Sequence, residues 1–148
     1  MTLATKLFQA PAFLAAPFVI PLRFDQTNKL LLLPFPERLT RSNFDLADSA
    51  LATFVARRGP ADTIVDFSDA CEEVDTTVIL ARAYAPWPAD HKRRVFIVSS
   101  DVMAGLFRMY GMHHAAAGFD VPPIVRSLED ALSLLGATDA TFDPVIYD

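Results

Sequence analysis

Short β-prone runs alternate with helical segments over most of this chain, and that alternation restricts its fold more than any other feature. Two apolar runs, 19–24 and 29–35, are joined by four turn-forming residues, so we expect a β-hairpin. Further β-prone runs follow at 63–67, 95–98 and 121–125. Because strands that alternate with helices usually lie parallel in one sheet, the sequence predicts an α/β fold whose mixed sheet begins with an antiparallel hairpin.

Four helices are expected between and after these strands, which gives the order β-β-α-β-α-β-α-β-α. The first begins near Ser42, carries apolar residues at three- and four-residue steps, and ends at Gly59. The second, 78–84, is apolar nearly all round, so we expect it to be buried. The third spans 101–112, and the fourth is capped by Ser127 and ends at Gly136. The expected inward positions are Phe44, Ala47, Leu51 and Phe54 in the first helix, Val102, Leu106 and Met109 in the third, and Leu128, Ala131, Leu132 and Leu135 in the fourth.

The N-terminal stretch 7–22 is apolar enough to suggest a membrane span or a secretory signal. A helix of this length reaches only ~24 Å, short of the ~30 Å hydrocarbon core, and three prolines would break it. A signal peptide is disfavoured because only one lysine precedes the stretch. We therefore expect an apolar arm over 1–17 that packs on its own domain or on a second copy, one domain over 18–136, and a C-terminal tail over 137–148.

Composition excludes several classes of protein. Hydrophobic residues make up 52% of the 148 residues and charged residues 21%, which indicates a globular domain with a substantial core. The net charge of −5 has the wrong sign for binding nucleic acid. Cys71 is the only cysteine, so neither an intrachain disulfide nor a thiolate zinc site can form, and the composition suits the reducing cytoplasm.

Catalytic and cofactor motifs are poorly represented. None of the five glycines lies in a phosphate-binding arrangement, which excludes a dinucleotide fingerprint and a P-loop. His113 and His114 are adjacent and point to different faces, so we interpret each as a surface or helix-end residue rather than a metal ligand. A Cys71 nucleophile with a histidine base is an alternative, since such pairs meet in space. We predict no catalytic residue, no cofactor and no metal.

The most polar segment is the loop that follows the run 63–67. Its five carboxylates lie at the carboxyl side of the expected sheet, where open α/β folds bind ligands, and magnesium prefers such oxygen ligands. A metal-dependent enzyme using the loop 66–75 is therefore one alternative. We favour a solvated loop that starts a helix, because its last residues are good caps. The residues concerned are Asp66, Asp69, Glu72, Glu73 and Asp75, followed by Thr76 and Thr77.

Two further features are candidates for binding. Arg108 and Tyr110 stand out from the apolar stripe of the third helix, where Arg108 could bind a carboxylate or phosphate bidentately or form a surface ion pair. The chain also has twelve phenylalanines, more than a core of this size ordinarily uses. Some of them are expected to line a groove, an interface or the pocket of a small apolar ligand, and the pocket candidates are Phe67, Phe96 and Phe107.

Four short segments carry a family resemblance that covers roughly 18–136. They are Val-Asp-Phe-Ser-Asp at 65–69, Val-Asp-Thr-Thr-Val at 74–78, Gly-Leu-Phe-Arg-Met-Tyr at 105–110 and Arg-Ser-Leu-Glu-Asp-Ala-Leu at 126–132. In this order they resemble the SpoIIAA-like (STAS-like) superfamily of bacterial anti-sigma-factor antagonists, and most closely the uncharacterised bacterial STAS/Sec14-like proteins near them. The resemblance implies a mixed sheet with the helices packed against it.

In the signalling members of that superfamily, a serine at the start of the second helix is phosphorylated to switch off partner binding. Matching by residue places the preceding aspartate at Asp75 and the phosphorylated residue at Thr76, although Val78 replaces the family's glycine. The resemblance thus implies a non-enzymatic interaction or regulatory module that binds a protein partner or forms a homodimer. The alternative is a carrier of a lipid or small apolar ligand.

Overall fold

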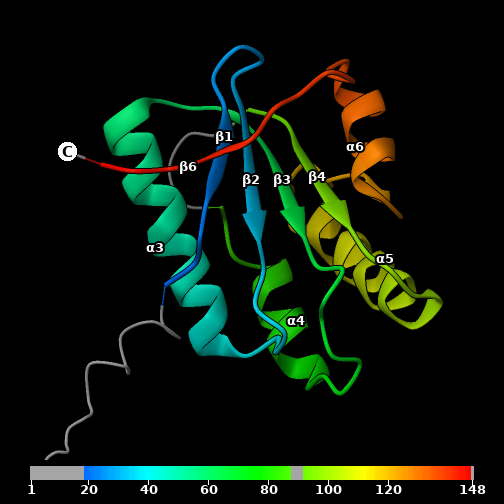
Figure 1. Ribbon diagram of the computed structural model, residues 1–148. Helices are drawn as coiled ribbons and strands as arrows, with labels where there is room; N and C mark the ends of the chain where they lie inside the picture. The colour runs from blue at the N-terminus through cyan, green and yellow to red at the C-terminus, as the bar shows by residue number, and fades with distance from the viewer. Residues whose placement is uncertain (1–18, 88–91, 148) are drawn as a thin grey trace, which may run out of the picture.

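The computed structural model describes residues 19–87 and 92–147, so the expected N-terminal arm over 1–17 lies outside the described residues. One six-stranded mixed sheet runs through the molecule in the order β5-β4-β3-β2-β1-β6 (Figure 1). β1 is antiparallel to both neighbours, whereas β2 to β5 are parallel. The strands are β1 Arg23–Asp25, β2 Leu30–Pro34, β3 Asp62–Asp66, β4 Arg94–Ile97, β5 Ile124–Val125 and β6 Asp143–Pro144.

Helices cover both faces of this sheet. Because β2 to β5 follow one another in a single direction across the sheet, right-handed crossovers place all their connecting helices on one face. That face carries the larger hydrophobic core, while the fourth helix packs on the opposite face (Figure 1). The helices are α3 Arg41–Arg58, α4 Thr76–Ala83, α5 Asp101–Ala116 and α6 Leu128–Leu135. The prediction of an α/β protein with a mixed sheet and packed helices is confirmed.

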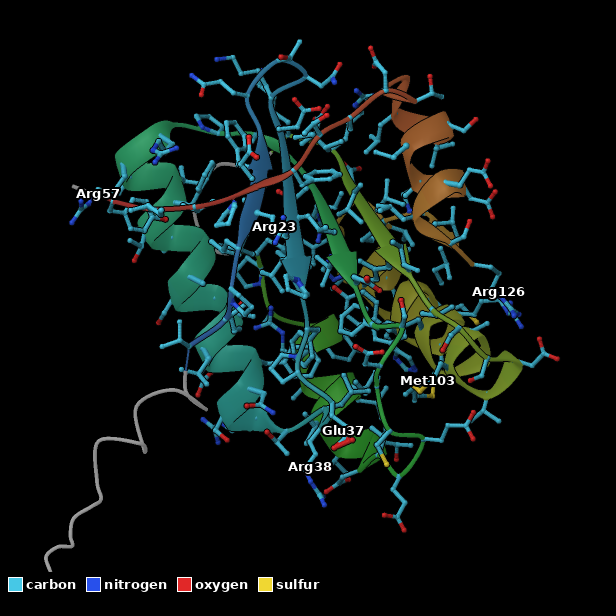
Figure 2. All side chains as sticks on the ribbon, viewed as in Figure 1. Arg23, Glu37, Arg38, Arg57, Met103 and Arg126 are labelled. Atoms are coloured by element: carbon cyan, nitrogen blue, oxygen red, sulfur yellow. The ribbon has the colours of Figure 1, made fainter. Side chains whose placement is uncertain are left out.

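The C-terminal segment adds a strand that the sequence pattern did not indicate. β6 pairs with β1 through Phe24 and Asp143, and the amide of Val145 donates to the carbonyl of Leu22 at 3.0 Å. Beyond it, the ring of Tyr147 lies under the guanidinium of Arg57 at 5.0 Å. Arg57 is near one end of α3, and Glu37 and Arg38 lie at the opposite end of the molecule (Figure 2).

The first helix forms as the sequence predicts. α3 begins after Thr40, whose hydroxyl accepts a hydrogen bond from the amide of Asn43 at 3.2 Å, and it ends at Gly59 with φ 87°. Glycine is needed there because other residues rarely adopt this φ. All four predicted inward positions, Phe44, Ala47, Leu51 and Phe54, are buried.

The buried face of α5 is different from the expected one. Val102 is 59% exposed, and Leu106 and Met109 are only half-buried. Apolar residues occur on several sides of this helix, so the spacing alone does not identify the side that packs on the sheet. The residues that do pack inward are Met103, Ala104, Phe107, Tyr110, Gly111 and His114, which corrects both the stripe and the placement of His114 at the surface.

The second helix is less buried than its composition indicates. Only Ile79 and Ala83 are fully buried in α4, because the helix packs against α5 and the core with a single face. Thr77 and Ala81 are exposed and Val78 is half-buried. The apolar sequence of α4 therefore leaves part of its surface open beside α3.

Candidate functional site

A groove lies between the N-terminal half of α3 and the exposed side of α4. Its volume is about 480 Å³, within the size range of ligand and peptide sites. Its lining includes the buried ring of Phe44, the half-buried Val78 and the small, exposed side chain of Ala81. The full lining is Arg41, Phe44, Asp45, Thr77, Val78, Ala81, Arg82 and Ala85.

Charged side chains border this groove. Arg82 on α4 donates two hydrogen bonds to Asp48 on α3, at 2.7 and 3.0 Å, and its guanidinium lies 5.3 Å from the centre of the Phe44 ring. Burial raises the pKa of Asp48 above its ordinary value, although the charge of Arg82 and its hydrogen bonds act to lower it. The ion pair fixes the spacing of the two helices.

The residues matched to the phosphorylation motif form the N-terminus of α4. Asp75 caps the helix, since its carboxylate accepts from the amide and the hydroxyl of Thr77 at 2.9 and 2.7 Å. The hydrogen bonds from Thr77 lower the pKa of Asp75. Thr76 is exposed at the first position of the helix, and Asp69 is exposed on the preceding loop. The predicted helix start at this loop is confirmed.

The acidic loop does not bring its carboxylates together. Asp66 accepts hydrogen bonds from the amide and the hydroxyl of Ser68, while Asp75 is occupied as the cap of α4. Over residues 19–87 and 92–147, no three His, Cys, Asp or Glu side chains form a group that could hold a metal ion. The loop therefore contributes a helix cap rather than an assembled set of ligands.

The structure separates Arg108 from Tyr110, which the sequence analysis grouped together. Arg108 is exposed on α5, but Tyr110 is buried, and burial raises the pKa of its hydroxyl. That hydroxyl accepts a hydrogen bond from the indole Nε1 of Trp87 at 3.3 Å. Tyr110 is thus part of the interior, and the expectation that it stands out from the apolar face is wrong.

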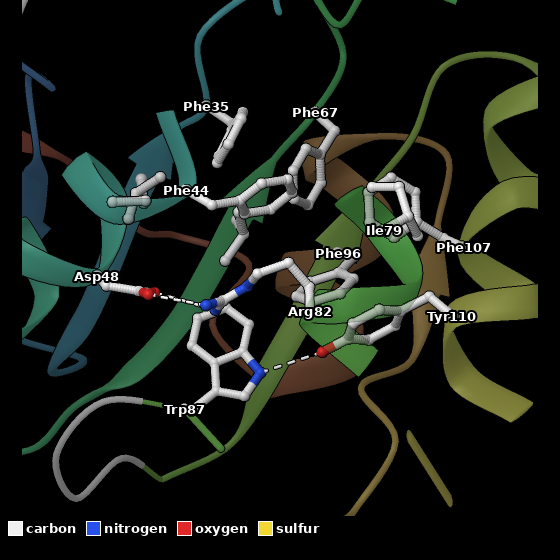
Figure 3. A pocket seen from close by; sticks show the side chains of 13 residues that line it. Phe35, Phe44, Asp48, Phe67, Ile79, Arg82, Trp87, Phe96, Phe107 and Tyr110 are labelled. Carbon is white, nitrogen blue, oxygen red and sulfur yellow. Dashed lines mark hydrogen bonds and ion pairs between the residues drawn. The ribbon is translucent and has the colours of Figure 1, made fainter. Parts of the chain in front are cut away.

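The three candidate phenylalanines meet around one cavity (Figure 3). Ring centres are 4.5 Å apart for Phe67 and Phe107, 5.3 Å for Phe67 and Phe96, and 5.5 Å for Phe96 and Phe107. The cavity has a volume of only about 20 Å³, which is room for roughly one water molecule. The predicted lining is present, but the rings fill the space between them.

Two arginines that the sequence did not indicate stack on Trp87, which lines this cavity. The guanidinium groups of Arg94 and Arg82 lie 4.5 and 5.9 Å from the centre of the Trp87 ring (Figure 3 shows Trp87 and Arg82). Arg94 is only 7% exposed, and burial lowers its pKa to about 10. Arg94 is thus buried at the start of β4, although it follows two exposed basic residues, Lys92 and Arg93.

His114 is also buried beside Tyr110. Its ring is stacked between Tyr110 and Phe119, at 5.0 and 4.7 Å, and its Nδ1 lies 2.7 Å from the carbonyl oxygen of Ala83. Nδ1 must carry a proton to donate to that oxygen, and Nε2 has no hydrogen-bond partner. Burial lowers the pKa of His114, so the neutral ring is favoured.

Comparisons with other proteins do not identify the chain. Among the described residues, no helix is both long enough and apolar enough to cross a membrane. Searches against protein-family models, curated proteins and solved structures gave no match. The STAS-like resemblance is therefore still a prediction from four short segments of sequence.

Proposed function

We propose that this chain is a non-enzymatic, STAS-like interaction module that forms a homodimer through the groove between α3 and α4. The observation that carries the proposal is the exposed side of α4, an apolar helix of which only Ile79 and Ala83 are fully buried. An apolar helix face open to water favours association, because covering it removes apolar surface from solvent.

Small side chains make the groove suited to a second helix. Ala81 is exposed at its centre and Ala85 is half-buried near its end, so another α4 could approach closely without displacing a large side chain. Tyr84, which is also exposed, provides a larger apolar surface at the same end of the helix. A two-fold axis across Ala81 would bring these surfaces together in both copies.

The charges around the groove support a second copy as the partner. Arg41 and Asp45 are both exposed and are one helical turn apart on α3. A surface with both signs is complementary to itself under two-fold symmetry, since Arg41 of one copy can face Asp45 of the other. Thr76, exposed at the N-terminus of α4, is the residue whose phosphorylation would add negative charge beside this interface.

The carrier alternative is not favoured by the interior. A lipid or other apolar ligand needs a cavity of roughly 300 Å³ or more, whereas the space among Phe67, Phe96 and Phe107 is about 20 Å³. We also infer a bacterial, cytoplasmic protein, from the resemblance and from the single cysteine.

The test is the mass of the full chain in solution, measured by light scattering during size-exclusion chromatography over a range of concentrations. We expect a dimer for the wild type and a dissociation constant raised by about tenfold or more for Ala81→Arg, because arginine fills the centre of the groove. Ala115→Arg is the matched control, since Ala115 is an exposed helical alanine on α5 that does not line the groove. A wild type that stays monomeric, or equal effects of the two variants, would refute the proposal.

A further inference from the structure

A second groove lies at the opposite end of the parallel strands, where β4 begins. Its volume is about 410 Å³, and its walls come from the segment before β4, the segment before β5 and the last turn of α6. None of the residues discussed for dimerisation contributes to it. The lining is Lys92, Arg93, Arg94, Val95, Asp120, Val121, Pro122, Pro123, Leu134 and Leu135.

One end of this groove is cationic. Lys92 is exposed, Arg93 is mostly exposed and donates to Asp62 at 2.7 Å, and Arg94 lies below them. Of the described residues that line the groove, Asp120 is the only acid. Among the described residues, three cations against the two carboxylates of Asp62 and Asp120 leave one excess positive charge here, on a chain whose net charge is −5.

Arg94 adds a buried cation to the lining of this groove. Its Nη2 donates to the carbonyl oxygen of Asp120 at 3.0 Å, but its buried Nη1 has no hydrogen-bond partner. No carboxylate lies within ion-pair distance of its guanidinium among the described side chains. Asp120 supplies part of the counter-charge of Arg94, and a further anion nearby reduces the cost of burying this cation.

The other end of the groove is apolar and open to water. Leu134 is 51% exposed and Val121 is 45% exposed, so both leave apolar surface in contact with water. Both lie beside the C-terminal turn of α6, whose partial negative charge disfavours an anion at that end. A ligand would therefore be oriented, with its charge at Lys92 and its apolar part against Leu134.

We propose that this groove binds a monocarboxylate with an apolar body. The carboxylate accepts hydrogen bonds from Lys92 and from Arg93, whose Nη1 is not used by Asp62, and the apolar body covers Val121 and Leu134. One excess positive charge matches a monoanion better than a phosphate dianion. The site is separate from the proposed dimer interface, so either proposal can fail without the other.

Octanoate is the probe, titrated into the full-length chain by isothermal calorimetry. Octanol has a similar tail without the charge, and acetate has the charge without the tail. We expect one octanoate per chain and binding about tenfold weaker or more for each of the other two. Trp87, the only tryptophan, stacks on Arg94, so its emission should change with octanoate.

Substitutions locate the site. Lys92→Met and Leu134→Asp should each weaken octanoate binding by about tenfold, through loss of the charge and of the apolar wall respectively. Leu128→Asp is the matched control, because Leu128 lies on the same helix, is 37% exposed and does not line the groove. The proposal is wrong if octanoate does not bind, if acetate binds equally well, or if Leu134→Asp and Leu128→Asp have the same effect. Circular dichroism confirms that each variant is folded.

Discussion

The hydrophobic cores on the two faces of the sheet differ in composition. Under α3, α4 and α5, twenty buried residues form a core rich in aromatic rings, with polar groups such as Asp48, Arg94 and His114 at its edges. Under α6, the buried core has six residues, all aliphatic, including Ile64 and Ala131. Large rings pack with gaps between them, and those gaps adjoin buried polar side chains. The small aliphatic residues on the other face pack without such gaps.

The polar and titratable groups of the interior are therefore concentrated on one face of the sheet. The face under α3, α4 and α5, here called the helical face, contains the internal cavity, the buried His114 and Arg94, whose Nη1 has no hydrogen-bond partner. The α6 face carries the small aliphatic core and contributes only the apolar end of the second groove. Substitutions on the two faces should therefore differ in size and in their dependence on pH.

The largest effect is expected from Phe67→Ala on the helical face. The ring of Phe67 contacts those of Phe35, Phe96 and Phe107 at 4.5 to 5.3 Å, so its removal leaves a cavity at the centre of the core. We expect the free energy of unfolding, measured with urea, to fall by about 3–5 kcal/mol. Leu132→Ala on the half-buried side of α6 should cost about 1–2 kcal/mol. Equal losses would contradict the comparison of the two faces.

The same contrast explains how much of the fold the sequence predicts. Phe44, Ala47, Leu51 and Phe54 occupy a single stripe, and polar residues fill most of the rest of α3, so the pattern has one solution. α5 has apolar residues on several sides, and packing against the sheet, which a lone sequence does not contain, selects among them. β6 is two residues long and includes a proline, so it carries no strand signal of its own.

The candidate site was predictable only in part. Phe67, Phe96 and Phe107 follow from the surplus of phenylalanine, and they do line one cavity. The stacking of Trp87 on Arg94 joins segments whose contact depends on how α4 is placed, and no spacing rule indicates it. Tyrosine and histidine are intermediate in burial among residue types, so their sequence positions do not assign Tyr110 and His114 to the interior, and burial here depends on partners from other elements.

A second prediction concerns pH. Folding lowers the pKa of His114 below its ordinary value of 6.5, mainly through burial, so the unfolded chain binds more protons at this residue as pH falls below 6.5. Arg94 and Arg82 also lower the pKa, while Ala83 and Asp120 oppose the shift. The contribution of His114 to stability is therefore complete above pH 6.5 and is lost below it, by at most about 1.4 kcal/mol per pH unit.

The variant His114→Phe tests this assignment by urea unfolding between pH 5 and pH 8. Phenylalanine keeps a ring between Tyr110 and Phe119 but does not titrate, so the fall in stability below pH 6.5 should become shallower. The variant His113→Gln, at the neighbouring residue, is measured beside it and the wild type. A slope that is the same in all three proteins would show that the titrating group lies elsewhere.

The smallest effect comes from removing one methylene from each face. Ile64 and Ile79 are both fully buried, but Ile64 packs within the aliphatic core of the α6 face, whereas Ile79 lines the cavity among the phenylalanines. A side chain that borders free space loses fewer contacts on truncation. We therefore expect Ile64→Val to cost about 1.5 kcal/mol and Ile79→Val about 0.5 kcal/mol in urea unfolding. If Ile79→Val costs as much as Ile64→Val, the helical face is packed as tightly as the other, and the gap between large rings does not explain why the polar groups gather on that side.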